Sequence, residues 1–224
     1  MSNPTLRYFD ARGVAEVSRV LFHLAGVPFN DHRYGVTRTT EGGFEFSAEF
    51  QNNKNNGDFH VNMDRLPLLE VNGVRIGQSR SIERYLANKY GFFGKSDEDR
   101  ALIDGVVENV RDIREKWSKV YYLPEGEDKT KQIADWWSTA FPEWLKKLEQ
   151  GLPENSSDVF VVGSTPSYAD VVIWHLLRDT FTDKASAQAA ETGANVARLT
   201  AIAEKVGNVE ALRTYLAGRP EIPF

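Results

Sequence analysis

The chain has 224 residues, a formal net charge of −5 and 41% hydrophobic residues. This length can bury a sizeable core in one large domain or two small ones. The negative charge, with no cluster of Lys or Arg, argues against nucleic acid or an anionic membrane as the main partner. The absence of cysteine excludes disulfides, cysteine-ligated metal centres and a thiol nucleophile belonging to the protein. The four histidines show neither HxxxH nor HExxH spacing, so we expect no metal site.

The chain also lacks the hydrophobic segments that direct proteins to membranes. Its start, MSNPTLRYFD, has no apolar core of a signal peptide, and no apolar run approaches eighteen residues. We therefore expect a soluble, cytoplasmic protein without a membrane partner.

The first residues predict a compact βαβ unit. Thr5–Phe9 alternates like a strand, and residues 14–25 place apolar side chains on one helical face. Gly26 follows this helix as its expected C′ residue. Residues 29–34 read as a second strand, entered at Pro28.

Residues 36–64 show little periodicity. The motifs TTEGG and NNKNNGD are polar and rich in turn residues, whereas Phe44, Phe46 and Phe50 offer aromatic anchors. We expect a partly ordered surface loop, mobile or functional, rather than regular structure.

Residues 65–87, RLPLLEVNGVRIGQSRSIERYLA, predict a β-hairpin that leads directly into a helix. Asn72-Gly73 between two short apolar runs is typical of a type I′ turn. Ser79 precedes the helical pattern and has two interpretations. It can cap the helix, or it can belong to a site where the helix N-terminus attracts a carboxylate or phosphate. With the βαβ unit, this ββα order predicts a small α/β layer on a mixed sheet.

Beyond Gly94 the pattern becomes all-helical. Ser96 with Asp97, Glu98 and Asp99 predicts a helix start, and Ser167-x-x-Asp170 predicts a second capping box. A further helical pattern runs from about residue 185 to 217. Two long apolar stripes are more typical of core than of a cofactor site: Leu102, Ile103, Val106, Val107, Val110, Ile113, Trp117, Val120 and Tyr121; and Ile133, Trp136, Trp137, Ala140, Phe141, Trp144, Leu145 and Leu148.

Four motifs in this order resemble the cytosolic glutathione transferases of the Tyr type, closest to the sigma class. They are LRYFDARGVAE at 6–16, the hairpin segment at 65–87, YGFFGKSDEDRALID from residue 90, and SYADVVIWHLL from residue 167. The resemblance spans the chain. It implies a thioredoxin-like α/β glutathione-binding domain at 1–92 and an all-α domain at 96–224 that carries the hydrophobic-substrate side.

The resemblance also implies roles for individual residues. Gln78 and Ser79 would hold the γ-glutamyl end of glutathione, the co-substrate, at the helix N-terminus. Leu66 would pair through its backbone with the cysteinyl part, next to a cis-proline at Pro67. The Tyr8 hydroxyl would donate a hydrogen bond to the sulfur, which favours the thiolate and lowers the thiol pKa. A Ser-type enzyme would need a serine soon after the first strand, and residues 9–17 contain none.

Other positions are implied at the edges of the site. Arg65 and Lys54 are candidates for the glycyl carboxylate, and Glu108 would reach the glutathione of a partner subunit in a homodimer. Phe9, Val14 and Ile113 would face the electrophile. Val14 stands where the RGRAE pattern of the family has a second arginine.

The reaction implied is attack of the glutathione thiolate on small hydrophobic electrophiles, as in detoxification. Two alternatives stay open on the sequence: a glutathione-dependent isomerase of the prostaglandin D synthase kind, and a crystallin-like or ligand-carrying protein on the same scaffold.

Overall fold

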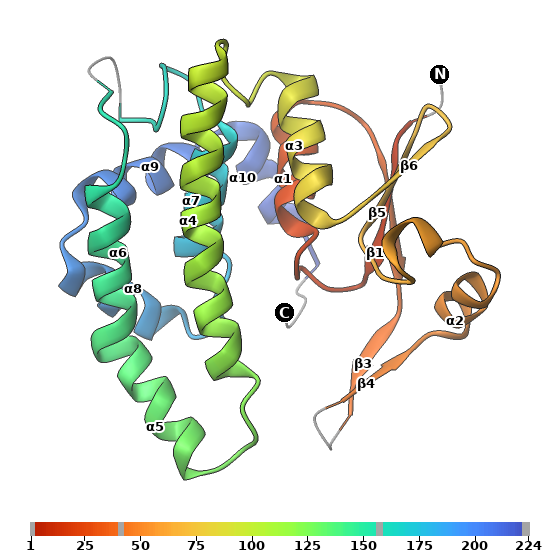
Figure 1. Cartoon of the computed structure of the whole chain (residues 1–224), viewed down its shortest axis with the longest axis horizontal. Coiled ribbons are helices and arrows are strands. Elements are labelled where there is room, and N and C mark those ends of the chain that lie inside the picture. Colours follow the sequence, from red (N-terminus) through yellow and green to blue (C-terminus); the bar gives the residue numbers. More distant parts are fainter. Residues whose placement is uncertain (1–2, 40–42, 156–158, 221–224) are drawn as a thin grey trace. The chain divides into compact units, whose positions relative to one another are not determined.

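The structure is a computed structural model that describes residues 3–39, 43–155 and 159–220 (Figure 1). The chain divides into two compact units. The first contains the residues up to 90 together with those from 210 onward, and the second contains residues 91–209. The predicted fold class, an α/β layer followed by an all-helical part, is confirmed.

The first unit is built on a four-stranded mixed sheet. Its strands are β1 (Thr5–Phe9), β2 (Asn30–Tyr34), β5 (Leu68–Val71) and β6 (Val74–Gly77), in the spatial order β2-β1-β5-β6. β1 and β2 are parallel, whereas the other two pairs are antiparallel. The predicted βαβ and hairpin strands are therefore confirmed.

The hairpin turn follows from its two central residues. Asn72 has φ 51° and Gly73 has φ 77°. Positive φ at both positions is what a type I′ turn requires, and these two residue types tolerate it best. The turn sets the register in which Val71 lies opposite Val74 and Leu68 opposite Gly77.

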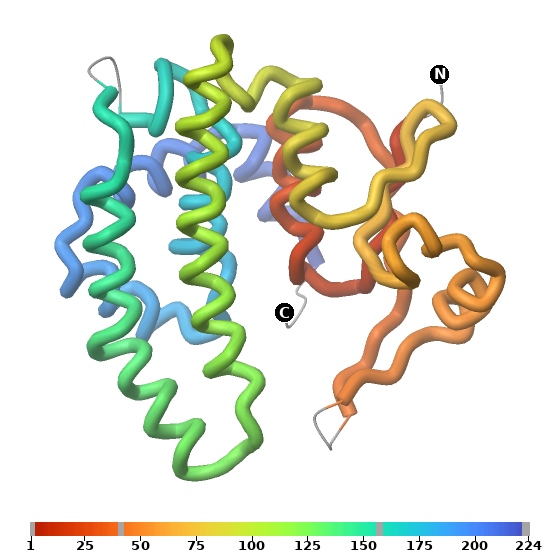
Figure 2. Tube along the Cα trace, in the orientation of Figure 1, coloured from red at the N-terminus to blue at the C-terminus, as the bar shows by residue number. Residues whose placement is uncertain are grey.

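Helices lie on both faces of this sheet. α1 (Glu16–Leu24) and α3 (Ser79–Tyr90) lie side by side on one face, and α2 (Ala48–Asn55) lies on the other (Figure 1). The last helix, α10 (Glu210–Gly218), packs against α1, so the two ends of the colour scale meet in Figure 2. The predicted domain limits of 1–92 and 96–224 stay a prediction, to which the structure adds this pairing of α1 with α10.

The expectation that residues 36–64 lack regular structure was wrong. The segment contains a two-stranded sheet of β3 (Val36–Arg38) and β4 (Phe44–Phe46), the helix α2, and a short 3₁₀ helix, η1 (His60–Asn62). Residues 40–42 of its TTEGG motif lie outside the described residues. The mobility expected for this segment remains untested.

Local capping and long-range packing explain the order of this segment. The Ser47 hydroxyl accepts a hydrogen bond from the backbone N–H of Phe50 at 3.3 Å and so begins α2. Phe50 and Phe59 are buried with Tyr34 and Leu68 in one cluster. Phe50 and Phe59 are stacked, with ring centroids 5.5 Å apart. These aromatic contacts join residues distant in the chain, which a periodicity analysis cannot detect.

The second unit is a helical bundle. The helical segments are α4 (Asp97–Tyr121), α5 (Glu127–Asp135), the π-helical η2 (Trp136–Ala140), α6 (Phe141–Gln150), α7 (Tyr168–Arg178), α8 (Lys184–Ala194) and α9 (Ala197–Gly207). α7 packs against both α4 and α9, and α6 packs against α4 and α8. Ser96 and Ser167 each form the predicted capping box with the aspartate three residues later.

Both predicted apolar stripes contribute buried residues to the core of this bundle, among them Val110, Ile113, Trp136 and Phe141, whereas Leu102 is 45% exposed. Trp117 contacts Trp136, Trp137 and Phe181, with ring centroids between 5.2 and 5.5 Å apart. Trp136 and Phe181 are buried and Trp117 and Trp137 are half-buried, so these aromatics pack against one another, as predicted. Each helix in the described part of the chain is too short or too polar to traverse a lipid bilayer.

Candidate active site

The sheet register brings the predicted site segments to one end of the first unit. β1 and β5 are antiparallel with Arg7 opposite Leu68, so Tyr8 at the end of β1 and Pro67 before β5 lie at the same end. β6 ends with Gly77 opposite Leu68, which places Gln78 there as well. The connection from β1 into α1 starts at this end too. The register therefore gathers three segments that are far apart in the sequence.

Tyr8 is held by the turn that follows β1. Its side chain is half-buried, and its hydroxyl oxygen accepts a hydrogen bond from the backbone N–H of Val14 at 3.4 Å. The ring lies 5.4 Å from that of Phe9 and 5.8 Å from the guanidinium carbon of Arg19. A phenol oxygen that accepts an N–H can still act as a hydrogen-bond donor through its own O–H.

Gly13 makes the close approach of this turn to Tyr8 possible. Its φ is 44°, in the region that glycine adopts with least strain. A Cβ at this position would lie 2.5 Å from the Tyr8 hydroxyl oxygen and 2.9 Å from Cε1. The turn therefore requires glycine for its backbone conformation and for space. The sequence motif contains this residue, but its contact with Tyr8 only appears in three dimensions.

The buried Arg19 side chain forms hydrogen bonds with the same turn and with two carboxylates. Arg19 Nη1 donates to the carbonyl of Ala11 at 2.8 Å, and Arg19 Nε donates to the Asp31 carboxylate at 3.1 Å. Arg19 Nη1 also donates to Glu16 at 3.1 Å. Because Arg19 and Glu16 are fully buried, these charge-assisted bonds hold the β1–α1 connection in a fixed geometry.

Helix α10 completes this buried charge cluster. The Tyr215 hydroxyl donates to Glu16 at 2.7 Å, and Arg219 Nη1 donates to the same oxygen at 2.6 Å. Burial, together with the adjacent Glu16 carboxylate, raises the pKa of Tyr215 well above its ordinary value, so the phenol stays a donor. The chain's last helix thus helps to fix α1 through one carboxylate.

The peptide bond between Leu66 and Pro67 is cis. Pro67 is buried and Leu66 is half-buried. Within the described part of the chain, neither the N–H nor the C=O of Leu66 takes part in a hydrogen bond. Leu66 can therefore offer both backbone groups to an extended ligand strand.

Gln78 and Ser79 begin α3. The backbone carbonyl of Gln78 accepts the N–H of Ile82 at 3.0 Å, and α3 starts at Ser79. Ser79 is therefore the first helical residue and Gln78 directly precedes it, and both interpretations of the Ser79 side chain stay predictions. Gln78 has φ 66°. The first free N–H groups of α3 and the Ser79 hydroxyl together form an arrangement that suits a carboxylate.

The two cations considered for the glycyl carboxylate are both exposed. Lys54 lies in the last turn of α2. Arg65 directly precedes Leu66, and its Nη2 lies 3.7 Å from the Met63 sulfur. Both belong to the first unit, and their roles stay predictions.

The predicted hydrophobic residues differ in exposure. Val14 is 42% exposed at the turn beside Tyr8. Phe9 is half-buried and packs against Phe46 and Phe50, with ring centroids 5.0 and 5.1 Å away. Phe9 therefore packs partly in the core of the first unit, whereas the side chain of Val14 is exposed to solvent.

Two predicted residues lie on α4 in the second unit. Ile113 is 1% exposed. Glu108 is half-buried and forms an ion pair with Arg111 at 3.1 Å. Their roles at the site stay predictions, and the ion pair is the arrangement expected of an ordinary i, i+3 pair on a helix.

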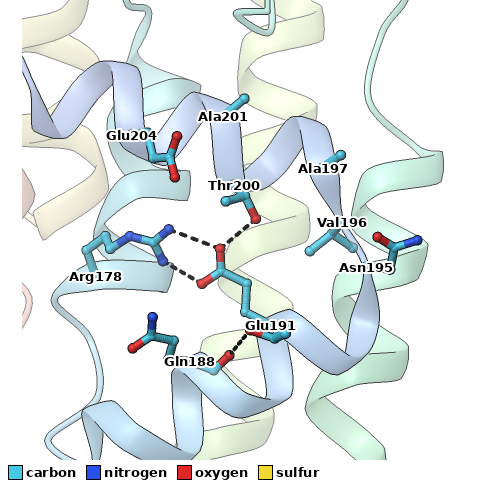
Figure 3. A pocket seen from close by; sticks show the side chains of 10 residues that line it. Arg178, Gln188, Glu191, Asn195, Val196, Ala197, Thr200, Ala201 and Glu204 are labelled. Atoms are coloured by element: carbon cyan, nitrogen blue, oxygen red, sulfur yellow. Dashed lines mark hydrogen bonds and ion pairs between the residues drawn. The ribbon is translucent and has the colours of Figure 1, made fainter.

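A polar hollow of about 450 Å³ lies in the second unit, lined by α8, α9 and the end of α7 (Figure 3). Its central carboxylate, Glu191, accepts Nη2 of Arg178 at 3.0 Å and the Thr200 hydroxyl at 2.6 Å. These three side chains form hydrogen bonds with one another, and the residues that line the hollow include none of the predicted site residues. We therefore place the candidate active site in the first unit.

Comparison with known proteins agrees with this geometry. The family description "Glutathione S-transferase, N-terminal domain" matches residues 4–88, and "Glutathione S-transferase, C-terminal domain" matches residues 111–219. The chain is 31% identical over 222 residues to Glutathione S-transferase 3 of Caenorhabditis elegans, covering 98% of each chain. It belongs to the glutathione S-transferase family.

Solved glutathione S-transferases share the whole fold. The enzyme from Ascaris lumbricoides superposes with a TM-score of 0.75 at 28% identity, covering 100% of both chains. A glutathione S-transferase from Necator americanus, described as monomeric, gives 0.78 at 26% identity, also over 100% of both. Family membership confirms the predicted enzyme class, and it makes glutathione the family's co-substrate.

Sequence reasoning missed one residue that contacts two segments of the candidate site. Asn62 is buried at the end of η1 and bonds to the residues around Pro67 and to Gln78. The local pattern predicts a loop for its segment, and no motif marks an asparagine whose partners lie up to sixteen residues away.

Proposed function

We propose that this glutathione S-transferase activates its co-substrate through Tyr8. The hydroxyl donates a hydrogen bond to the glutathione sulfur, which favours the thiolate over the thiol. The observation that supports this proposal is the hydrogen bond from the Val14 N–H to the Tyr8 hydroxyl oxygen. That bond occupies one acceptor site of the oxygen and polarises the O–H, which makes the phenol a better hydrogen-bond donor.

The same end of the sheet offers groups for the rest of the tripeptide. We assign the cysteinyl backbone to the N–H and C=O of Leu66 beside Pro67. We assign the γ-glutamyl carboxylate to Ser79 and the free N–H groups of α3, with Gln78 next to it. The glycyl carboxylate is left to Arg65 or Lys54, both exposed cations of the first unit.

The thiolate then forms a bond to an electrophilic carbon of a small hydrophobic substrate. In a substitution the leaving group departs with its bonding electron pair, and in an addition that pair moves to another atom of the substrate, which is then protonated. We propose that Phe9 and Val14 face this second substrate, whereas Ile113 is 1% exposed and packs in the core of the second unit. Val14 supplies an exposed apolar surface where the sigma-type motif has a cation. A neutral electrophile therefore suits the site better than the anionic substrate of an isomerase.

We assign the chain to the Tyr type, closest to the sigma class, on its motif from Leu6 to Glu16. We further propose a cytoplasmic homodimer in which Glu108 reaches the partner's glutathione. The Arg111 ion pair must then be shared or broken. Light scattering at micromolar concentration tests the assembly, and a monomer, as in the Necator americanus relative, would remove the role of Glu108.

The mechanism is tested by Tyr8→Phe. This change removes the donor with little loss of packing volume, so folding and glutathione binding should persist. The pKa of bound glutathione should return toward about 8.5, and the conjugation rate at pH 6.5 should fall roughly ten- to a hundred-fold. The deficit should shrink as the pH rises, because solvent then ionises the thiol.

Two further variants make the test specific. Ser79→Ala should raise the KM for glutathione with a smaller change in the pH profile. Tyr122→Phe removes an exposed phenol of the second unit and should change neither quantity. If Tyr8→Phe conjugates at the unaltered rate from pH 6 to 9, Tyr8 is not the activating group.

A further inference from the structure

The side chain of Asn62 connects two segments of the first unit. Its Nδ2 donates to the carbonyl of Arg65 at 3.0 Å and to the carbonyl of Pro67 at 3.0 Å. Its Oδ1 accepts the backbone N–H of Gln78 at 3.1 Å. The side chain is therefore fully engaged, and Asn62 is only 3% exposed. Because two carbonyls face Nδ2 and one N–H faces Oδ1, the amide has a single satisfactory orientation.

These three hydrogen bonds are made to residues next to the backbone groups that, in the proposed function, bind glutathione. Arg65 and Pro67 stand on either side of Leu66, which offers its N–H and C=O to the cysteinyl part. Gln78 directly precedes Ser79, where the γ-glutamyl carboxylate is expected. The Asn62 amide therefore sets the distance between the Leu66 backbone and the start of α3, the two segments to which the tripeptide is assigned.

The packing around Asn62 shows that this connection is close and specific. A Cβ at Gly77 would lie 2.6 Å from the Cβ of Asn62 and 2.8 Å from its Oδ1. Gly77 therefore leaves the space that Asn62 occupies. Gln78 has a φ of 66°, which non-glycine residues rarely adopt, and its N–H is the one held by Asn62. The amide thus fixes the unusual conformation at the start of α3.

We propose that Asn62 is a positioning residue for glutathione binding: it holds the Leu66 backbone and the Gln78–Ser79 turn at the separation that the tripeptide needs. This inference rests on the proposed function. Asn62 is buried, and its hydrogen bonds go to the backbone of Arg65, Pro67 and Gln78 rather than to Tyr8. Its removal should therefore affect binding of glutathione far more than ionisation of the thiol.

The decisive variant is Asn62→Asp. A carboxylate can still accept the N–H of Gln78, but it cannot donate to the carbonyls of Arg65 and Pro67, and it repels them. The Leu66 segment should shift while the start of α3 stays in place. Because a displacement of about 1 Å can cost roughly a hundred-fold in a well-positioned site, we expect the KM for glutathione to rise at least about ten-fold. Asn62→Ser, which is too short to reach both segments, should act in the same direction.

A matched control exists in the second unit. The Nδ2 of Asn155 also donates to two backbone carbonyls, those of Phe160 at 2.9 Å and Gly163 at 2.8 Å. Asn155→Ala therefore removes the same kind of contact away from the proposed glutathione groups. It should lower the melting temperature without raising the KM for glutathione.

The measurements are the KM for glutathione, kcat at saturating glutathione, the pH profile of kcat, and the melting temperature, all on the full chain. The expected result is a raised KM for glutathione in both Asn62 variants, with the pH profile unchanged. A KM within two-fold of the unaltered protein in Asn62→Asp would overturn the proposal. So would an equal rise in Asn155→Ala, because the effect would then follow stability alone.

These results remain separate from the test of the proposed function. If Tyr8→Phe leaves the pH profile unaltered, the assignment of Tyr8 fails, while the KM of the Asn62 variants still reports on positioning. If Asn62→Asp shifts the pH profile instead of the KM, Asn62 acts on thiol ionisation and the positioning role is refuted.

Discussion

Replacing Gly13 with alanine should separate the geometry of the Tyr8 hydroxyl from the stability of the fold. The new Cβ would lie 2.5 Å from the hydroxyl oxygen and 2.9 Å from Cε1 of Tyr8. Favourable contacts between such atoms begin at about 3.5 Å, so the ring must retreat by roughly 1 Å. A hydroxyl misplaced by that distance should lower kcat about a hundred-fold, which corresponds to roughly 2.7 kcal/mol in the activation barrier.

The same substitution has a backbone cost that must be measured separately. Gly13 has φ 44°, and an L-residue in this region costs about 1–2 kcal/mol. Gly26 is the matched control, since its φ is 62° but a Cβ added there would meet no other atom within 4 Å. Gly26→Ala should therefore lower the free energy of unfolding by a similar backbone amount and leave kcat unchanged.

The assay is conjugation of glutathione to chlorodinitrobenzene at pH 6.5, with urea unfolding of the same preparations. The reasoning requires Gly13→Ala to lose activity far beyond Gly26→Ala at comparable stability. Equal kcat in the two variants would show that the Tyr8 hydroxyl does not depend on the space left by Gly13, and the explanation for this glycine would be refuted.

Three further variants test a buried carboxylate of the first unit, the protonation of His23, and the N-terminal cap of α4. Glu16→Gln removes the carboxylate that Arg19 shares with α10, and it should lower the free energy of unfolding in urea by about 3 kcal/mol; a loss below about 1 kcal/mol would contradict the role assigned to it. Burial lowers the pKa of His23 despite the nearby carboxylates of Asp31 and Glu16, so the folded chain favours the neutral imidazole. The stability that His23 contributes is present above its ordinary pKa of about 6.5 and is lost as the pH falls below that value. His23→Gln should therefore weaken the pH dependence of the free energy of unfolding between pH 7 and 5. An unaltered pH dependence would contradict this reasoning. Ser96→Ala opens the capping box of α4 and should cost about 1 kcal/mol, with no change in the KM for glutathione.

Local patterns in the sequence were sufficient for the regular elements. Asn72-Gly73 predicted the hairpin because both residues accept positive φ, which is a property of two adjacent residues. Ser96 and Ser167 predicted the starts of α4 and α7, since a capping box needs only residues three positions apart. These contacts are short in sequence, and a motif therefore contains all of their partners.

The segment 36–64 shows where local patterns fail. Its β3, β4 and α2 are short, and α2 has no apolar stripe of its own beyond Phe50. The segment is ordered by burial of Phe50 and Phe59 against Tyr34 and Leu68. Two of these partners lie outside the segment, so its order could not be read from its own composition.

The candidate site divides in the same way. The sequence by itself indicated Tyr8, Pro67, Gln78 and Ser79 as candidate site residues, because they stand in ordered motifs, and their roles stay predictions. Only the tertiary structure decided how they are held. The register of β1, β5 and β6 brings them together, and Asn62 supplies the bonds across that end of the sheet.

The buried carboxylate of Glu16 is a final example. A sequence motif places it in α1, but nothing local indicates that it receives Tyr215 and Arg219 from about two hundred residues away. A buried charge must find partners wherever the fold provides them, because an unpaired one is too costly to retain. Contacts between residues close in the chain can therefore be predicted from the sequence. The partners of a buried charge, by contrast, are determined only by the tertiary structure.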